Sequence, residues 1–429
     1  MMTDKKTGNY RWVVVALLFF ATTINYLDRQ VIGLLKPTLE KQFGWTEIDY
    51  GHIVMVFQTA YAVGLLFFGR IIDKVGTKLG YVFSIIIWSL SAMAHALVNG
   101  ILGFSIVRAA LGLGESGNFP AAIKSVAEWF PKKERALAAG IFNCGANIGA
   151  IVAPIMVPLI LGIYGWQMAF VVTGAIGFIW LIFWWIFYET PKKHSKLTPA
   201  EYAHIHSDDE DIAESNVTKT NWGQLLGFKQ TWAFVFGKLL TDPIWYFFLF
   251  WLPGYFASTF KLDLSKPSLP LVIVYSATTI GSIGGGYLSS ALIKKGWAVF
   301  KARKTAMLLF ALCVLPIIFA RYANNIWQAV ALISLAAAAH QAWSATIFTT
   351  ASDMFPKRAV SSVVGIGGMA GSVGGIFFPL LIGYVLEAAK QAGHISTGYN
   401  IIFTFCGFAY LTAWIIMHFL APKMKRVEL

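Results

Sequence analysis

The chain has 429 residues, of which 57% are apolar and only 13% are charged, so about 245 apolar side chains have few charges to cover them. Soluble domains carry roughly 25% charged residues and a transmembrane helix uses roughly 20 apolar ones, so the composition excludes one soluble core and suffices for about twelve spans. Three widely spaced cysteines exclude a disulfide-stapled secreted domain.

Long apolar runs predict the elements in chain order. Each is read as a membrane helix, and the set predicts an all-α polytopic membrane protein. The twelve predicted spans cover approximately residues 11–35, 52–69, 79–98, 101–123, 136–161, 166–188, 232–258, 269–292, 304–321, 326–350, 360–387 and 398–420. The first run is too long for a signal peptide and is expected to be retained.

The spacing of these runs predicts three parts. We expect an N-terminal six-helix bundle over residues 1–190, a cytoplasmic central loop over 191–230 and a C-terminal six-helix bundle over 231–429. The loop is the only long polar linker in the sequence. Two such six-helix halves are the architecture of secondary transporters, in which the halves rock about a central site.

Basic residues set the expected orientation. The formal net charge is +13, and most of the 34 Lys and Arg residues fall in the loops on the side of both termini. The opposite loops hold Lys36, Lys41, Lys261, Lys266, Arg321 and Lys390. This asymmetry predicts cytoplasmic termini in a cell (inner) membrane. It also explains the basic excess without a nucleic-acid partner.

An internal repeat relates the two halves at an offset of 225 residues. Phe130-Pro131-Lys132 pairs with Phe355-Pro356-Lys357, and Glu128 pairs with Asp353. The same offset places His340 opposite Glu115. Because both Phe-Pro-Lys turns are expected on the cytoplasmic side, the repeat is predicted to be parallel, about an axis along the membrane normal.

Ionisable residues inside the predicted spans locate the expected chemistry, because such groups are costly in a membrane and usually functional. Asp28 and Arg29 lie in the first span, and Arg108 and Glu115 lie two turns apart in the fourth. No acid at i±4 neutralises Arg29 within its own helix. A guanidinium in a central cavity favours a planar anion such as a carboxylate. Asp28 or Glu115 would then act as a proton-coupling group.

The second half supplies a further polar set. Lys238 and Asp242 have i, i+4 spacing, which suits either a salt bridge within the helix or contact with substrate. His340 is a candidate for hydrogen bonding to substrate or for titration. Hydroxyl-binding and aromatic side chains accompany these charges and fit a polyhydroxylated acid: Tyr26, Tyr61, Asn147, Trp343 and Ser344.

The sequence resembles the major facilitator superfamily in the turn after the second span. Gly69-Arg70-Ile71-Ile72-Asp73-Lys74-Val75-Gly76 is similar to that superfamily's signature. The resemblance implies that Gly69, Arg70, Asp73, Lys74 and Gly76 take part in the cytoplasmic gate.

Other segments resemble the anion:cation symporter family, and within it bacterial hexuronate transporters. They are Asn25 to Arg29, Arg108 to Ala121, Gly237 to Tyr246, Leu292 to Lys304 and His340 to Ser344. The resemblance implies that Arg29 binds the substrate carboxylate, that Asp28 and Glu115 carry protons, and that Arg108 interacts with Glu115. Thr346 stands where many hexuronate carriers have Asn.

These observations together predict a transporter, not an enzyme, that imports glucuronate or galacturonate with protons by alternating access. No cofactor or metal is expected besides the proton, and a monomer in the lipid bilayer is expected. A transporter of another sugar acid such as galactonate, or of another organic anion, is the alternative. A membrane-embedded enzyme is less favoured, because neither H-E-x-x-H nor a nucleophile elbow is present. A channel fits the charge pattern less well still.

Overall fold

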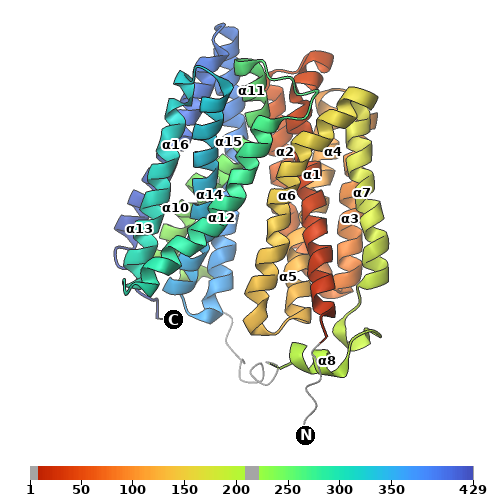
Figure 1. Cartoon of the computed structure of the whole chain (residues 1–429), viewed down its shortest axis with the longest axis vertical. Coiled ribbons are helices and arrows are strands. Elements are labelled where there is room, and N and C mark those ends of the chain that lie inside the picture. The colour runs from red at the N-terminus through yellow and green to blue at the C-terminus, as the bar shows by residue number, and fades with distance from the viewer. Residues whose placement is uncertain (1–7, 208–221, 429) are drawn as a thin grey trace. The chain divides into compact units, whose positions relative to one another are not determined.

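The computed structural model describes residues 8–207 and 222–428, and these form helices joined by short turns. Eleven of the helices in the described part are long and apolar enough to cross a membrane. The predicted all-α polytopic class is therefore confirmed. Figure 1 shows the long helices within each part of the chain running side by side.

The chain divides into two compact units. Unit 1 contains the segments Met1–Val31, Val56–Ala153 and Ile160–Val217. Unit 2 contains the segments Ile32–Met55, Pro154–Leu159 and Thr218–Leu429. Three long helices, α1, α2 and α6, contribute to both units. The bundle boundaries expected at residues 190 and 230 stay a prediction.

The described part of unit 1 contains seven main helices, of which α1, α2 and α6 are shared with unit 2, and the short helix α8. The helices are α1 (Tyr10–Phe43), α2 (Glu47–Val75), α3 (Thr77–Ala94), α4 (Gly100–Glu115), α5 (Asn118–Trp129), α6 (Lys132–Tyr164), α7 (Trp166–Phe187) and α8 (Pro199–Ile205). Helix α3 packs against α4 and α7. Helix α1 runs beyond its predicted end at residue 35.

The predicted span over residues 101–123 is two helices in the structure. Helix α4 ends at Glu115 and α5 begins at Asn118, with Ser116 and Gly117 between them. The hydroxyl of Ser84 donates a 2.7 Å hydrogen bond to the carbonyl oxygen of Gly114 just before the break. A side chain therefore supplies a donor to one of the carbonyls that a helix end leaves without an intrahelical partner.

Unit 2 contains the remaining helices. They are α9 (Trp222–Leu226), α10 (Lys229–Phe250), α11 (Leu252–Phe260), α12 (Leu269–Lys294), α13 (Val299–Val314), α14 (Ile326–Met354), α15 (Lys357–Gln391) and α16 (Ile395–Leu420), with a 3₁₀ helix over Leu315–Tyr322. Helix α10 packs on α15 and α16, and α12 packs on α14. The predicted span over residues 232–258 is α10 followed by α11, because the chain leaves the helix at Trp251.

The two copies of the predicted repeat have the same backbone geometry at the Phe-Pro turns. Pro131 precedes α6 with φ −63° and ψ 152°, and Pro356 precedes α15 with φ −65° and ψ 150°. The copies differ one helix earlier. The segment of unit 1 breaks after Glu115, whereas α14 of unit 2 continues unbroken through His340.

Candidate functional site

Arg29 and Glu115 form a buried ion pair in unit 1. The Glu115 Oε2 atom lies 2.7 Å from Arg29 Nη2 and accepts a 2.8 Å hydrogen bond from Arg29 Nε. The two residues are 1% and 0% exposed. An arginine that no acid neutralises within α1 is thus paired with a carboxylate from α4. Removal of either partner would leave an uncompensated buried charge.

Three aromatic rings surround the same guanidinium. The Cζ atom of Arg29 lies 4.7 Å from the ring centre of Tyr61, 4.8 Å from that of Tyr26 and 5.2 Å from that of Phe57. Such cation–π contacts strengthen when water is excluded, as it is here. Tyr26 and Tyr61 were expected at the site, but Phe57 was not. Its apolar ring carries no sequence signal that separates it from ordinary packing residues.

Arg108 and Asp28 are the other two buried charged residues of this cluster. The Nη2 atom of Arg108 donates a 3.3 Å hydrogen bond to the backbone oxygen of Arg29, and its guanidinium also lies 5.3 Å from the Phe57 ring centre. Asp28 is 2% exposed, and neither of its carboxylate oxygens accepts a hydrogen bond from the described residues. The cluster therefore places two guanidinium groups and two carboxyl groups together.

Glycines allow the close helix packing that positions this cluster. A Cβ atom on Gly112 would lie 2.5 Å from the Phe57 carbonyl oxygen, and one on Gly114 would lie 2.5 Å from the Trp88 nitrogen. Helix α4 consequently packs directly against α2 and α3, which holds Glu115 in the interior. Gly112 and Gly114 thus help to place the ion pair.

Helix α6 approaches α1 through two further glycines. A Cβ atom on Gly145 or on Gly149 would lie 2.4 Å from a carbonyl oxygen of α1. Asn147 lies two residues from each and is buried. Since residues two apart point in directions about 200° apart on a helix, its side chain lies on the side of α6 that faces away from α1.

In unit 2, Lys238 and Asp242 are paired within α10. The Lys238 Nζ atom lies 2.8 Å from Asp242 Oδ2 and 4.3 Å from the centre of the Phe348 ring. Helix α15 can approach this carboxylate only because residue 371 is glycine, where a Cβ atom would lie 2.2 Å from Asp242 Oδ2. The pair therefore combines a salt bridge with tight helix packing.

The other predicted residues of unit 2 pack mostly in its interior. The Nδ1 atom of His340 shares a hydrogen bond with the Tyr410 hydroxyl, and its ring stacks on Trp245 at a centroid distance of 5.5 Å. Trp343 is fully buried, edge-on to Tyr410. Ser344 is half-buried. His340 and Trp343 thus belong to an aromatic cluster that supports α14.

The signature motif lies at the end of α2. Arg70 and Lys74 are exposed, and Gly76 has φ +88°, a conformation that favours glycine at the turn into α3. Gly69 lies on the last turns of α2. The side chain of Asp73 falls outside the described residues. The Lys124 ammonium of α5 donates a 3.0 Å hydrogen bond to the Ile72 carbonyl, which ties the motif to α5.

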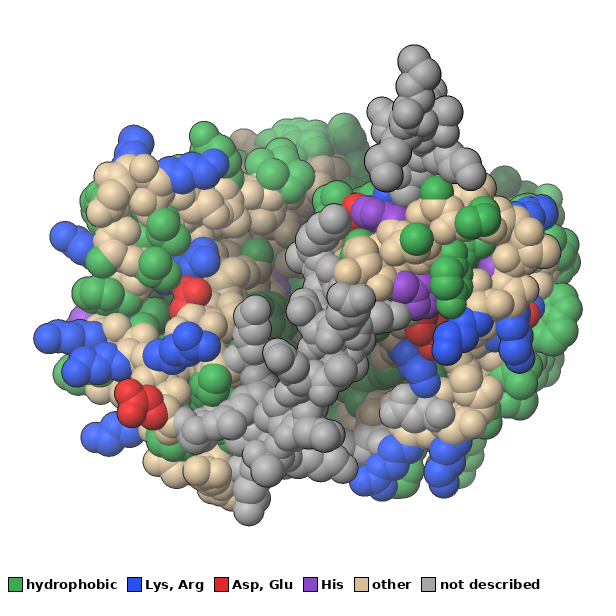
Figure 2. Space-filling view, turned by 90° about the horizontal axis from the view of Figure 1, so that it is seen from below, with side chains coloured by type: hydrophobic (Ala, Val, Ile, Leu, Met, Phe, Trp, Pro, Cys, Tyr) green, Lys and Arg blue, Asp and Glu red, His purple; other side chains and the backbone are tan. Residues whose placement is uncertain are grey.

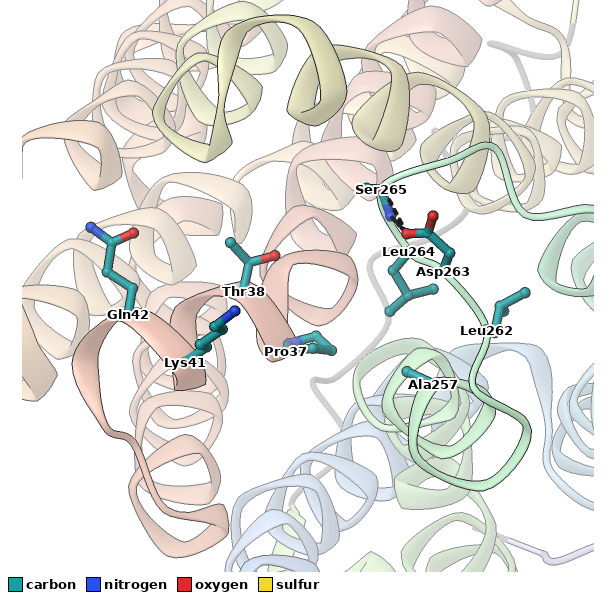
Figure 3. Close-up of a pocket in the computed structure, with 9 residues that line it drawn as sticks. All are labelled: Pro37, Thr38, Lys41, Gln42, Ala257, Leu262, Asp263, Leu264 and Ser265. Atoms are coloured by element: carbon teal, nitrogen blue, oxygen red, sulfur yellow. Dashed lines mark hydrogen bonds between the residues drawn. The ribbon is translucent and has the colours of Figure 1, made fainter.

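A cavity of about 610 Å³ in unit 2 lies apart from all of these residues. Figure 3 shows it between the end of α1 and the loop after α11, lined by residues such as Pro37, Lys41, Leu262 and Asp263. The Asp263 carboxylate accepts hydrogen bonds from Ser265. Its lining includes none of the predicted site residues.

Two further properties of the described residues bear on ligands. No group of three or more His, Cys, Asp or Glu side chains among them is arranged to hold a metal ion. Figure 2 shows Lys and Arg side chains gathered on the end of each unit seen from below.

Comparison with known proteins gives consistent matches over nearly the whole chain. The model of the Major Facilitator Superfamily matches residues 18–379. The "Hexuronate transporter" of Escherichia coli K12 is 31% identical over 89% of this chain and 89% of its own length. The "Galacturonate transporter" of Dickeya chrysanthemi is 32% identical over 66% and 82%, respectively.

A more distant relative and a solved structure extend these matches. The "D-galactonate transporter" of Escherichia coli O6:H1 is 27% identical over 89% of this chain and 90% of its own length. A crystal structure of a bacterial homologue of the human lysosomal transporter Spinster, inward-facing and occupied, has a TM-score of 0.79 at 17% identity, covering 99% of this chain and 100% of that one. The structural likeness shows the fold.

Proposed function

Because this chain belongs to the Major Facilitator Superfamily and is a multi-pass membrane transporter, we propose that it imports a hexuronate, glucuronate or galacturonate, together with protons. The cycle proposed is alternating access by a monomer in the inner membrane, with both termini cytoplasmic and no cofactor besides the proton. The hexuronate and galacturonate transporters that it resembles support this substrate class.

The charge balance of the buried cluster in unit 1 carries the proposal. Arg29 and Arg108 match Asp28 and Glu115 one for one, and all four residues are at most 2% exposed. An anionic substrate that enters such a cluster adds one negative charge that no cation offsets. Buried net charge is costly, so uptake of a proton with the anion restores the balance. Coupling to protons follows from the same residues that bind the anion.

Arg29 is proposed to exchange one carboxylate for another. In the structure its Nε and Nη2 atoms both meet Oε2 of Glu115. A substrate carboxylate can take the place of Glu115, because the planar guanidinium fork donates two parallel hydrogen bonds to a carboxylate. Glu115, displaced from its cation within a desolvated site, then favours its protonated form. Tyr26 and Tyr61 would hold the guanidinium in position during the exchange.

Asp28 is proposed as the second proton-coupling group, because its carboxylate is buried without a hydrogen bond from the described residues. Arg108 would keep Arg29 oriented through the Arg29 carbonyl and favour the charged form of the nearby acids. Release of substrate on the cytoplasmic side would let the Arg29–Glu115 pair form again, and the protons would leave there.

Residues of unit 2 are proposed to recognise hydroxyl groups. Lys238 and Ser344 carry donors for that task, and the His340–Tyr410 and Trp343 packing would fix the orientation of α14. Asn147 of unit 1 is proposed to contribute an amide in the same way. The motif residues Gly69, Arg70, Asp73, Lys74 and Gly76 are proposed to act in the cytoplasmic gate.

A binding screen of the purified protein tests the substrate class. Titration with glucuronate, galacturonate and galactonate at acidic and at neutral pH should show the two hexuronates binding more tightly, with the preference for acidic pH that proton coupling requires. Tighter binding of galactonate would favour the alternative cargo suggested by the galactonate relative. Binding of none of the three acids at either pH would overturn the proposed substrate class.

A further inference from the structure

Unit 1 has an apolar groove on its surface between α1 and α7. The groove has a volume of about 430 Å³ and is lined by Val13, Ala16, Leu17, Phe20, Ile24, Ile176, Ile179, Trp180, Phe183 and Phe187. Leu17, Ile24 and Trp180 are buried and form its floor, while Phe20, Ile179 and Phe183 are exposed and form its rims. The Trp180 indole donates a 2.9 Å hydrogen bond to the Leu17 carbonyl, which fixes the floor.

The groove runs lengthwise along the two helices. Its residues recur every three or four positions on each helix, so they occupy one face of α1 and one face of α7. From Val13 to Ile24 this face extends about 16 Å at 1.5 Å per residue. Half of a bilayer hydrocarbon core is about 15 Å thick. The groove therefore matches the length of an acyl chain in one leaflet.

Cationic side chains lie at the end of the groove near the N-terminus of α1. The Lys196 ammonium sits 5.7 Å from the centre of the Phe187 ring, which closes that end. Lys192 and Lys193 lie between Phe187 and Lys196 in the sequence and, like Lys196, are exposed. Of the described acids near this end, Glu189 is paired with Lys78 at 3.0 Å and Glu201 with Arg11 at 3.3 Å. The end of the groove thus carries excess positive charge at the level where lipid headgroups lie.

We propose that this groove is a binding site for one anionic phospholipid, such as phosphatidylglycerol, from the leaflet on the side of the α1 N-terminus. An acyl chain would lie along the α1–α7 floor, and the phosphate would meet Lys196 and its neighbours. Basic pockets beside membrane helices bind anionic headgroups in this way. Exposed Trp185 and the nearby Lys78, 5.0 Å from its ring centre, would lie at the same interface.

The test measures lipid binding directly and does not depend on transport. Native mass spectrometry of the full chain, released from detergent with equal amounts of phosphatidylglycerol and phosphatidylcholine of identical acyl chains, counts the retained lipids. We expect phosphatidylglycerol to be retained about tenfold more than phosphatidylcholine by the wild type. Lys196→Glu should abolish that preference.

Two further variants separate headgroup from groove. Lys301→Glu is the matched control, because Lys301 is also exposed and also lies over an aromatic ring, 5.0 Å from the Trp297 centre, but in unit 2. It should keep the preference. Ala16→Trp fills the groove and should lower the retention of both lipids. Equal retention in the wild type, an equal effect of Lys301→Glu, or full retention in Ala16→Trp would each overturn the proposal.

Discussion

The guanidinium of Arg29 lies 2.7 Å from the carboxylate of Glu115 and joins α1 to α4 across 86 residues of sequence. Two acids and two arginines in this buried cluster leave no charge in excess when all four are ionised. In the proposed cycle, Arg29 is the anion-binding group and Glu115 is its internal competitor. Substitution of each residue in the cluster is therefore expected to have a different effect on binding or transport.

Arg29→Lys should reduce hexuronate transport by at least about tenfold. Lysine keeps the positive charge but offers no planar fork, so one charge-assisted hydrogen bond, worth about 1.5–3 kcal/mol, is lost. Counterflow in proteoliposomes measures the loss. Arg426→Lys, at an exposed position near the C-terminus, controls for the general effect of the substitution. Full counterflow activity of Arg29→Lys would show that the bidentate contact is not needed.

Glu115→Gln should tighten hexuronate binding and remove much of its pH dependence. The amide cannot compete as an anion for Arg29, so the substrate carboxylate no longer has to displace a charged partner. Titration of the purified variant at acidic and neutral pH measures both effects. Weaker binding at every pH, with the wild-type pH dependence intact, would contradict the exchange of carboxylates at Arg29.

Asp28→Asn should separate substrate exchange from proton-driven accumulation. The amide keeps the size and shape of the Asp28 side chain while removing a titratable group. We expect counterflow to continue and accumulation driven by a pH gradient to fall to background. Asp263→Asn, a change at an exposed loop position, should leave both intact. Undiminished accumulation in Asp28→Asn would remove Asp28 from the coupling scheme.

The Lys238–Asp242 pair should be coupled in stability. Either single change, Lys238→Met or Asp242→Asn, leaves the other charge buried without its partner and should cost about 2 kcal/mol or more. The double variant should recover part of that loss, because both charges are gone. Thermal unfolding in detergent across the four proteins gives the coupling energy. Additive losses would show that the two side chains act independently.

A charge cluster at the end of unit 1 makes the docking of α8 depend on pH. Burial raises the pKa of Glu134, but hydrogen bonds with His204 and Arg11 outweigh it, so the pKa lies below its ordinary value of 4.5. Because its pKa is lowered, ionised Glu134 stabilises the folded state at pH values above the ordinary pKa. This stabilisation is lost as the pH falls through the lowered pKa. The Arg11 Nε atom and the His204 Nε2 atom lie 3.0 and 2.9 Å from its oxygens.

Hydrogen exchange of the α8 amides measures this dependence. At neutral pH, Glu134→Gln should exchange faster than the wild type, and the difference should shrink as the pH falls below about 4. Glu189→Gln is the control, since Glu189 binds Lys78 of α3. A difference between Glu134→Gln and wild type that persists unchanged at low pH would contradict the role assigned to the carboxylate.

The fold was predictable to the level of its helices, because apolar runs of about 20 residues have few alternatives in a membrane. The ends of the helices were less predictable from the sequence. Helix α1 continues to Phe43, past the charged residues Lys36 and Glu40, whose side chains pair at 3.0 Å. A hydropathy profile counts these two charges as the end of the span, because it does not take their pairing into account. The break after Glu115 also escaped prediction, because the contact that meets the Gly114 carbonyl there comes from Ser84 on another helix, which local spacing does not show.

The candidate site was predictable as a set of residues but not as a set of contacts. Buried charges in apolar helices identified Asp28, Arg29 and Glu115, because their cost in a membrane makes them rare. Which acid meets which arginine depends on how α1 and α4 pack, and no local spacing encodes it. Trp343, which is fully buried, could not be assigned from the sequence in the same way. An aromatic residue in an apolar helix gives the same sequence pattern whether its side chain contacts a ligand or only packs in the interior.

Uptake of radiolabelled glucuronate and galacturonate into proteoliposomes tests the central claim most directly. With an inwardly directed pH gradient imposed, we expect accumulation above equilibrium for the wild type, collapse of that accumulation with a protonophore, and no accumulation by Arg29→Lys. Equilibration without accumulation under the same gradient, or equal accumulation by Arg29→Lys, would contradict the coupling of proton and anion at this cluster.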